Sequence, residues 1–396
     1  MKISFVSANE FDFTPLTPFE SPLGGMHSAL CYLALHLARR GHDVKLINRT
    51  TRPGIYGGVE CLTLETGLRP EYLQTSDVMV SISSIGQALR RRGVERPMIL
   101  WTGHDIDQAA VRNLGDGNDR FAWDKFILVS HWQSERYSSK FAISEDDIIV
   151  LPNAIAPAFE TRSRTRPLFF EDGRPPVLMY SSAPFRGLAI LADAFPKIRE
   201  QIPGTTAHIY SSMDIYQSSS SQELSLLYNR CRQTEGMKYF GSISQSELGQ
   251  SILETDIFSY PSTFAETSCI SLMEAMASEC LVITREFGAL SETASGFGHF
   301  LNASTQAPAT LFADDYAKFC VDIIKDAYDN RSKYCDQLSA AKTFVRATYV
   351  WSVVAARWEA ALEAVSRSTP RSLPSRNASC PCGSGKRFKH CCGSLA

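Results

Sequence analysis

The 396-residue sequence has no apolar run that approaches the ~20 residues of a membrane-spanning helix, so it predicts no transmembrane segment. It has no strong charge imbalance either: 40 basic and 42 acidic residues give a formal net charge of −2, which argues against nucleic-acid binding. Its apolar start is too short and too soon interrupted, at Asn9 and Glu10, for a signal peptide, and reads instead as a buried strand. We therefore expect a cytoplasmic, soluble globular protein, and peripheral contact with a membrane stays open.

The sequence also lacks a pattern of cysteines typical of a disulfide framework. Without a secretion signal, a reducing compartment is expected, and buried free cysteines then act as small apolar side chains. Four of the eleven cysteines lie together at the carboxyl terminus. The other seven are scattered singly, at Cys31, Cys61, Cys231, Cys269, Cys280, Cys320 and Cys335.

What the sequence does contain is an alternation of short apolar runs with helical patterns, which predicts βαβ units and parallel sheets. In the first half, strands are expected at 3–7, 43–48, 78–82, 98–102, 126–130 and 148–151, with helices at 28–40 and 132–140. In the second half, strands are expected at 177–181, 206–210, 238–241, 256–260 and 280–284, with helices at 188–202, 245–254, 314–328, 331–348 and 352–367.

The most informative run is 264–277, which places Glu266 and Glu274 eight residues apart. Apolar residues recur at helical spacing from Ile270 onward, so a helix is expected to begin near Ser268. Glu266 then lies in the loop before this helix and Glu274 lies in its early turns. In open α/β sheets, loops at the carboxyl ends of the strands are where ligands bind. The alternative is an ordinary amphipathic helix with two solvated glutamates.

This run resembles the E-x7-E signature of GT-B glycosyltransferases of the family 4 type. Phe264, Glu266, Glu274 and the Ala-Met-Ala that follows match the pattern, whereas Cys269, Glu279 and Leu281 stand where it has Gly, Gly and Pro. The resemblance implies an α/β protein of GT-B fold, with two Rossmann-like domains facing across a cleft. Glu266 would then bind sugar hydroxyls and Glu274 the ribose diol, since carboxylates accept strong hydrogen bonds from hydroxyl groups.

The resemblance also orders the chain into domains. We expect an acceptor-side Rossmann-like domain over 1–165 and a nucleotide-sugar-binding domain over 166–348. A final helix, 349–366, is expected to pack back on the first domain, with the crossing at Tyr349, Val350 and Trp351. A Ser-, Pro- and Arg-rich stretch, 367–379, reads as a flexible linker to a small module at 380–393.

Three further positions resemble donor-phosphate contacts of the family. Gly24 and Gly25 precede a helix, so their backbone could approach a diphosphate closely; the alternative is a plain left-handed turn. Arg186 occupies the place of a family Lys that neutralises the leaving diphosphate, and the alternative is a surface arginine. The earlier family Arg falls on Tyr180 or Ser181, so one cation is missing, and Arg285 is a candidate replacement.

In the first half, His104 follows an apolar strand and resembles the family histidine that lies over the transferred sugar. A lone histidine is otherwise more often structural. His131 and Trp132 are candidates for the acceptor side, and Glu292 matches a family position on the loop after the signature.

The resemblance implies transfer of a sugar, hexosyltransferase-like, from a nucleotide-diphosphate donor to an acceptor hydroxyl with retention. His104, Arg186 and Glu266 are the expected catalytic residues, and no catalytic metal is expected. The acceptor is left open among a glycan, a lipid-linked compound and a small molecule. Two other hypotheses remain: a non-catalytic GT-B scaffold that recruits partners, and a nucleotide-sugar epimerase.

The carboxyl-terminal run is a separate module. Cys380, Cys382, Cys391 and Cys392 have the spacing C-x-C-x8-C-C, and four thiolates suit one tetrahedral Zn²⁺. So short a peptide cannot bury a core, so the metal would supply its folding energy. The run resembles the SEC-C motif, a zinc knuckle that implies a protein partner. The alternative is a Cys-rich tail that oxidises.

Overall fold

The structure is a computed structural model, and it describes residues 1–115, 117–217, 221–304, 308–371, 374–380 and 384–391. The chain divides into two compact units. The first unit comprises 1–17, 26–152 and 351–396, and the second comprises 18–25 and 153–350. Both contain a sheet of parallel strands with helices, which confirms the expected α/β class with two Rossmann-like halves. Within the described residues, no helix is both long and apolar enough to cross a membrane.

The sheet of the first unit has the strand order β3-β4-β2-β1-β5-β6-β7-β8. All neighbours are parallel except the β3–β4 pair. The fully buried strands β5 and β6 are near-continuous apolar runs, as expected for a parallel sheet covered on both faces. The strands are β1 (Lys2–Val6), β2 (Asp43–Asn48), β3 (Gly54–Tyr56), β4 (Val59–Thr63), β5 (Val78–Ser81), β6 (Met98–Thr102), β7 (Lys125–Leu128) and β8 (Ile148–Val150).

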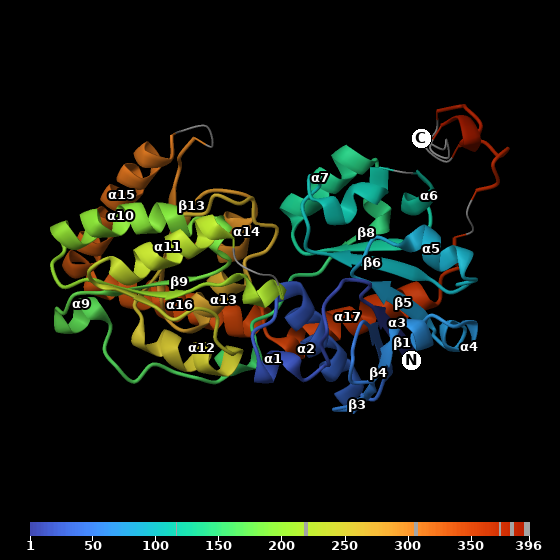
Figure 1. The fold of residues 1–396 in the computed structure, drawn as a ribbon, viewed down its shortest axis with the longest axis horizontal. Helices are drawn as coiled ribbons and strands as arrows, with labels where there is room; N and C mark the ends of the chain where they lie inside the picture. Colours follow the sequence, from blue (N-terminus) through green and yellow to red (C-terminus); the bar gives the residue numbers. More distant parts are fainter. Residues whose placement is uncertain (116, 218–220, 305–307, 372–373, 381–383, 392–396) are drawn as a thin grey trace. The chain divides into compact units, whose positions relative to one another are not determined.

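Helices cover both faces of this sheet, and Figure 1 shows α5, α6 and α7 on one side of β6 and β8, with α17 on the other. Trp358 of α17 packs edge-on against Trp101 of β6, with ring centroids 4.7 Å apart, which anchors the last long helix to this core. The helices are α2 (Gly25–Arg39), α3 (Leu64–Gly67), α4 (Pro70–Leu73), α5 (Gly86–Arg91), α6 (Gly117–Arg120), α7 (His131–Phe141) and α17 (Trp351–Ser366).

Two strands of the first unit, β3 and β4, were not expected from the sequence. Strands β3 and β4 form an antiparallel hairpin at the sheet edge, joined by Gly57 and Gly58, both with positive φ. The three residues of β3 are largely exposed, and Ile55 is 78% exposed. A strand this short at an edge has no apolar run to reveal it, so the pattern that identified the buried strands did not apply.

The second unit holds an all-parallel sheet with the order β11-β10-β9-β12-β13-β14. The expected strands at 177–181 and 206–210 are confirmed with the same bounds. The short strand β14 was missed, because its three residues are only half-buried. The strands are β9 (Val177–Ser181), β10 (Thr206–Tyr210), β11 (Met237–Tyr239), β12 (Ile257–Tyr260), β13 (Leu281–Arg285) and β14 (His299–Leu301).

Helices of the second unit also lie on both faces of their sheet: Figure 1 shows α10 and α15 on one side of β9 and α16 on the other. Helix α16 has the bounds expected from the sequence. The helices are α1 (Thr17–Glu20, at the junction of the units), α8 (Pro157–Glu160), α9 (Phe169–Asp172), α10 (Leu188–Gln201), α11 (Gln222–Gln233), α12 (Gln245–Ser251), α13 (Ile270–Ala277), α14 (Leu290–Ala294), α15 (Ala309–Asp329) and α16 (Arg331–Thr348).

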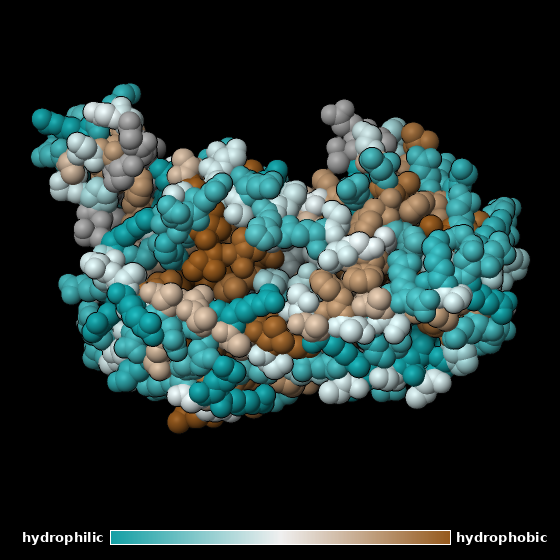
Figure 2. Space-filling view, turned by 180° about the vertical axis from the view of Figure 1, so that it is seen from behind, coloured by the Kyte–Doolittle hydropathy of each residue, from teal (hydrophilic) through white to brown (hydrophobic). Residues whose placement is uncertain are grey.

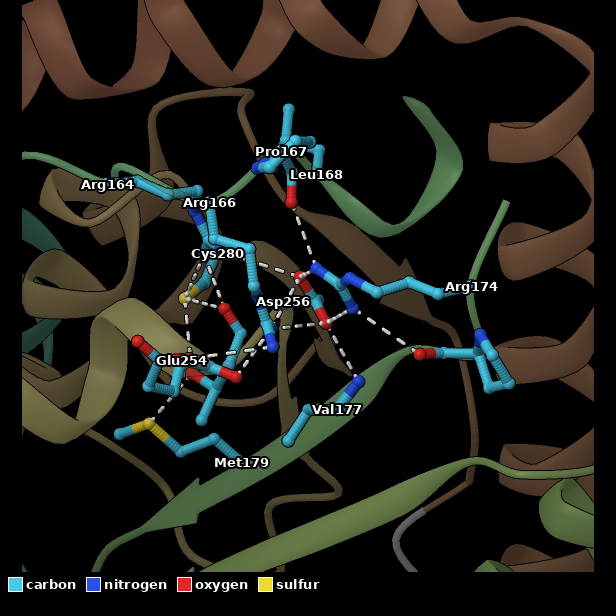
Figure 3. A network of polar contacts seen from close by, with 12 residues as sticks. Arg164, Arg166, Pro167, Leu168, Arg174, Val177, Met179, Glu254, Asp256 and Cys280 are labelled. Atoms are coloured by element: carbon cyan, nitrogen blue, oxygen red, sulfur yellow. Dashed lines mark hydrogen bonds and ion pairs between the residues drawn. The ribbon is translucent and has the colours of Figure 1, made fainter. Parts of the chain in front are cut away.

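The units divide after Pro152, earlier than the boundary expected near residue 165. The physical reason is a cluster of three arginines on one buried carboxylate, drawn in Figure 3. Asp256, directly before β12, accepts hydrogen bonds from Arg164, Arg166 and Arg174, the last through both terminal nitrogens at 2.7 Å. Because these arginines come from 153–176, this Arg-rich stretch belongs to the second unit rather than to a free linker.

The carboxyl-terminal segment belongs to the first unit. Arg371 donates from its backbone nitrogen and its guanidinium to Asp124 and Asp147, so the expected flexible linker is held at this point. Further on, the buried Phe388 contacts Phe121, with ring centroids 5.8 Å apart. Hydrophilic side chains cover much of the described segment in Figure 2.

Candidate active site

Glu266 lies in the loop between β12 and α13, and its backbone is held by a close approach. It forms a parallel bridge with Gly288, and the backbone nitrogen of Ala289 donates to the carbonyl of Glu266. Gly288 has φ +68°, and a Cβ placed there would lie 2.4 Å from the carbonyl oxygen of Glu266. Since a side chain cannot fit at that distance, the position of Glu266 depends on a glycine at 288.

Arg186 ends the short turn after β9, and a second glycine brings this turn against the end of β12. Gly187 has φ +123°, and a Cβ there would lie 2.2 Å from the carbonyl oxygen of Pro261. This approach lets Nη1 of Arg186 donate to both carboxylate oxygens of Glu266, each at 2.6 Å. The structure therefore joins two of the three expected catalytic residues as one ion pair.

The surroundings of this pair fix its geometry and its charge. The hydroxyl of Tyr260, at the end of β12, donates to Oε1 of Glu266, whose side chain is only 5% exposed. The guanidinium of Arg186 lies 4.1 Å from the ring centre of Phe264. Burial alone would lower the pKa of Arg186, but the adjacent carboxylate raises it well above its ordinary value. The pair thus places a carboxylate, which can accept hydrogen bonds from hydroxyl groups, beside a cation of the kind that binds phosphate groups.

Gly24 and Gly25 lie in the second unit, close to this pair. A Cβ on Gly24 would lie 3.4 Å from the ring of Tyr216, and one on Gly25 would lie 3.3 Å from Ile270 at the start of α13. Neither glycine has positive φ, so the left-handed turn considered above is wrong for both. Tyr216 also contacts Arg186, with its hydroxyl 3.5 Å from Nη2. A side chain at Gly24 would make ordinary contacts with Tyr216, and one at Gly25 would require a small shift of Ile270.

Glu274, in the middle of α13, is buried more deeply than a solvated glutamate would be. Its side chain accepts a hydrogen bond from the backbone nitrogen of Ala156 at 3.2 Å, and its residue is 3% exposed. Burial raises its pKa to about 8, a shift that this hydrogen bond only partly offsets. At neutral pH the carboxyl group therefore holds a proton and can donate as well as accept.

This pKa makes stability depend on pH in a defined direction. The unfolded chain releases the Glu274 proton near pH 4.5, but the folded chain keeps it up to about pH 8, so unfolding releases a proton in between. Stability should therefore fall as pH rises from about 5 to 8, by up to about 1.4 kcal/mol per pH unit from this group. We expect Glu274→Gln to remove this slope, measured as melting temperature against pH for both proteins. Parallel curves would contradict the prediction.

His104 lies in the first unit, directly after β6. Its Nδ1 is 3.0 Å from the hydroxyl of Thr102, and Thr102 also accepts from the His104 backbone nitrogen. Burial and, to a smaller extent, the charged form of His104 lower the pKa of His27. His131 and Trp132 begin α7, where the Trp132 ring stacks with Arg136.

Two other candidates are engaged elsewhere in the second unit. Arg285, considered as a replacement cation, is 4% exposed, donates to the carbonyl of Ala303, and packs between Phe287 and Phe312. Tyr180, at one possible place of the missing arginine, is fully buried and donates to the carbonyl of Ala183. Glu292 lies in the first turn of α14.

Sequence reasoning did not assign roles to Tyr260, Tyr216 or Gly187. Tyr260 is the last residue of a buried strand, and Gly187 directly follows Arg186. Their places in the sequence, beside a predicted strand end and a predicted site residue, could therefore have pointed to a role. Tyr216 had none, because it belongs to a short 3-10 turn after β10 that no periodicity marks.

Within the carboxyl-terminal module the structure describes residues 380 and 384–391. Ser379 and Arg387 form an antiparallel bridge, and Gly385 has φ +71°. Cys380 is buried and its backbone nitrogen donates to the carbonyl of Lys386, while Cys391 follows the turn that contains Phe388. Cys382 and Cys392 lie outside the described residues, within which no group of three metal-ligating side chains occurs.

Comparisons with known proteins match two parts of the chain to described families. Residues 175–321 match the family described as glycosyl transferases group 1, and residues 376–394 match the SEC-C motif. By sequence alone, no curated protein matches.

Solved structures share the fold at low identity. A glycosyltransferase from Rickettsia africae is 13% identical with a TM-score of 0.67, over 92% of this chain and 98% of that one. Sucrose-phosphate synthase from Thermosynechococcus elongatus is 15% identical with a TM-score of 0.68, over the same shares. Anabaena HepE, solved with UDP-glucose, is 17% identical with a TM-score of 0.63, over 92% of this chain and all of that one. The chain therefore has the GT-B fold, with a match to glycosyl transferases group 1 over residues 175–321 and a match to the SEC-C motif over residues 376–394.

Proposed function

We propose that this protein transfers a sugar from a nucleotide-diphosphate donor to an acceptor hydroxyl, with retention of configuration. The observation that carries the proposal is the Arg186–Glu266 pair, which joins a phosphate-binding cation to a hydroxyl-binding carboxylate in the domain that matches glycosyl transferases group 1. Neighbours of the same fold were solved with UDP-glucose and with UDP and GlcNAc, which supports a nucleotide sugar as donor.

In this proposal the residues have separate roles. Arg186 neutralises the leaving diphosphate, with Gly24 and Gly25 leaving room for it, and Glu266 accepts hydrogen bonds from hydroxyls of the transferred sugar. Glu274 binds the ribose diol, and His104 orients the sugar. The departing phosphate takes the acceptor proton, so no carboxylate nucleophile is required, unlike most retaining glycosidases. Catalysis then consists of positioning and charge stabilisation.

The carboxyl-terminal module is proposed to hold one structural zinc ion through Cys380, Cys382, Cys391 and Cys392. The SEC-C match supports this ligand set, and four thiolates are donors that structural zinc prefers. The ion would fold the module and take no part in transfer, and the module would be the contact site for a protein partner.

A ligand screen tests the proposed activity. We expect one class among UDP-, GDP- and ADP-sugars to raise the melting temperature, because a ligand at 100 times its Kd stabilises the native state by about 2.7 kcal/mol. The stabilising donor should then be consumed, with product analysis showing transfer to an acceptor. No shift with any donor would favour a non-catalytic scaffold. Conversion of the donor to its epimer without an acceptor would favour an epimerase.

A further inference from the structure

At the carboxyl edge of the first unit's sheet, a chain of hydrogen bonds joins residues to which the proposed function assigns no role. The backbone nitrogen of Ala8 donates to the hydroxyl of Ser83 at 3.0 Å, and that hydroxyl donates to Oδ1 of Asn9 at 3.0 Å. The Nδ2 group of Asn9 lies 3.0 Å from Nε2 of His27. We call the hydrogen-bonded side chains of Ser83, Asn9 and His27 the relay. Asn9 follows β1 and Ser83 follows β5, two neighbouring parallel strands, so the relay lies at the edge where open α/β sheets bind ligands.

The direction of the relay determines the tautomer of His27. Because the amide oxygen of Asn9 accepts from Ser83, its amide nitrogen must donate to Nε2 of His27. The neutral ring therefore carries its proton on Nδ1, for which no hydrogen bond is found among the described residues. Successive donors polarise one another, which strengthens Nδ1–H as a donor.

His27 is also neutral at physiological pH. Burial, and to a smaller extent the charged form of His104, lower its pKa to about 4. The ring packs edge-on against Phe11 and Phe13, with centroids 4.4 Å and 5.3 Å away, and Phe11 is only half-buried. An apolar ring face beside a neutral donor is the combination that suits a sugar ring.

Two carboxylates next to residues of this site, Glu10 and Asp105, are paired with arginines. Glu10, next to Asn9, lies 3.0 Å from Arg49. Asp105, next to His104, binds Arg136 at 2.7 Å. None of the side chains in the relay is a cation, so it offers hydrogen bonds but no charge to balance a phosphate group.

We propose that Asn9, Phe11 and His27 form an acceptor subsite for an uncharged, hydroxyl-bearing sugar ring, and that phosphorylated sugars are poor acceptors. The inference rests on the proposed function, whose acceptor it narrows. His27 donates from Nδ1 to an acceptor hydroxyl, Asn9 holds the ring in this tautomer, and Phe11 covers one face of the sugar.

The test compares matched acceptors on the full-length protein with the donor that the ligand screen selects. Glucose is compared with glucose 6-phosphate, and N-acetylglucosamine with its 6-phosphate, by KM and kcat. We expect transfer to the neutral member of a pair, with a kcat/KM at least about tenfold above that of its phosphate, since a buried phosphate without a cation is costly. Equal or better use of the phosphorylated members would overturn the inference.

A variant separates the role of His27 from a structural one. We expect His27→Gln to raise the acceptor KM about five- to tenfold, the cost of one hydrogen bond, with donor KM and melting temperature little changed. The matched control is His36→Gln on the same helix, where His36 bonds only the backbone carbonyl of Tyr32; its acceptor KM should match the wild type.

The results of these experiments distinguish a failure of the proposed sugar transfer from a failure of the proposed acceptor subsite. A wild-type protein that consumes no donor contradicts the proposed function. A protein that consumes donor, but whose acceptor KM is the same in His27→Gln and wild type, contradicts this inference alone. An effect of His27→Gln on donor KM instead of acceptor KM would also overturn it, because the bound ring would then be the donor sugar. Should His27→Gln fail to fold, the comparison of neutral and phosphorylated sugars on the wild type still decides.

Discussion

Replacing Glu266 with Gln should reduce sugar transfer by about 100- to 1,000-fold, the typical cost of removing one group that stabilises developing charge. Gln has the same shape and still reaches Tyr260, but it lacks the charge that pairs with Arg186 and that the proposed function assigns to the sugar hydroxyls. The rate is measured as product formed with the donor that the ligand screen selects.

The same substitution should not weaken nucleotide binding, although it reduces turnover. In the wild type, Glu266 neutralises Arg186, the cation assigned to the diphosphate. Removing the carboxylate charge frees the guanidinium, so the Kd for the nucleoside diphosphate should stay equal or become lower while turnover is lost. Binding is measured by calorimetry with the free nucleoside diphosphate of the selected donor.

A matched control is available in the same unit. Glu279 is ion-paired with Lys342 at 2.7 Å and has no role in the proposed site, so Glu279→Gln should keep wild-type turnover. Wild-type turnover in Glu266→Gln would remove Glu266 from the mechanism. Weaker nucleotide binding together with lost turnover would indicate that Glu266 mainly supports the local structure.

Replacing Asp256 with Ala should be the most destabilising change in the second unit, at about 3–5 kcal/mol. Its side chain is fully buried and also accepts from the backbone nitrogen of Val177 at 2.9 Å. Its loss would leave the guanidinium of Arg164, only 4% exposed, without a counter-ion. Arg166 and Arg174 lose the same partner, so the stretch from residue 153 to β9 should detach from the sheet.

The measurement is urea unfolding followed by circular dichroism, with the midpoint compared between variants. The control is Asp193→Ala, which breaks the pair with Arg230, where both side chains are more than a third exposed. Exposed pairs contribute at most about 1 kcal/mol, so the control should unfold near the wild type. A similar midpoint for Asp256→Ala and Asp193→Ala would show that the arginine cluster does not hold this stretch.

Glu279 and Cys269 both stand where the family pattern has Gly, but their backbone conformations differ. Glu279 stands where the pattern has Gly, and its backbone has φ +57°, a left-handed conformation that favours glycine. The chain therefore keeps the backbone shape that the glycine serves, with Lys342 bonded to the Glu279 side chain. Cys269 also replaces a Gly, but its φ of −97° is ordinary, so that position needs no glycine for backbone reasons.

The sequence by itself determined the α/β class, the two parallel sheets and most strand positions. Buried parallel strands must be apolar throughout, and this leaves a signal that needs no knowledge of their neighbours. The resemblance to the E-x7-E signature and its neighbouring motifs also singled out Glu266, Glu274 and Arg186, whose roles stay predictions.

Only the tertiary structure decided which of these groups meet. Arg186 and Glu266 are 80 residues apart and become partners because β9 and β12 are adjacent and Gly187 allows the turn to touch Pro261. The arginines that hold 153–176 to Asp256, and the relay from Ser83 through Asn9 to His27, likewise join distant segments. Hydrogen bonds and ion pairs depend on distances of a few ångström between side chains, and only the packing of the whole chain determines those distances.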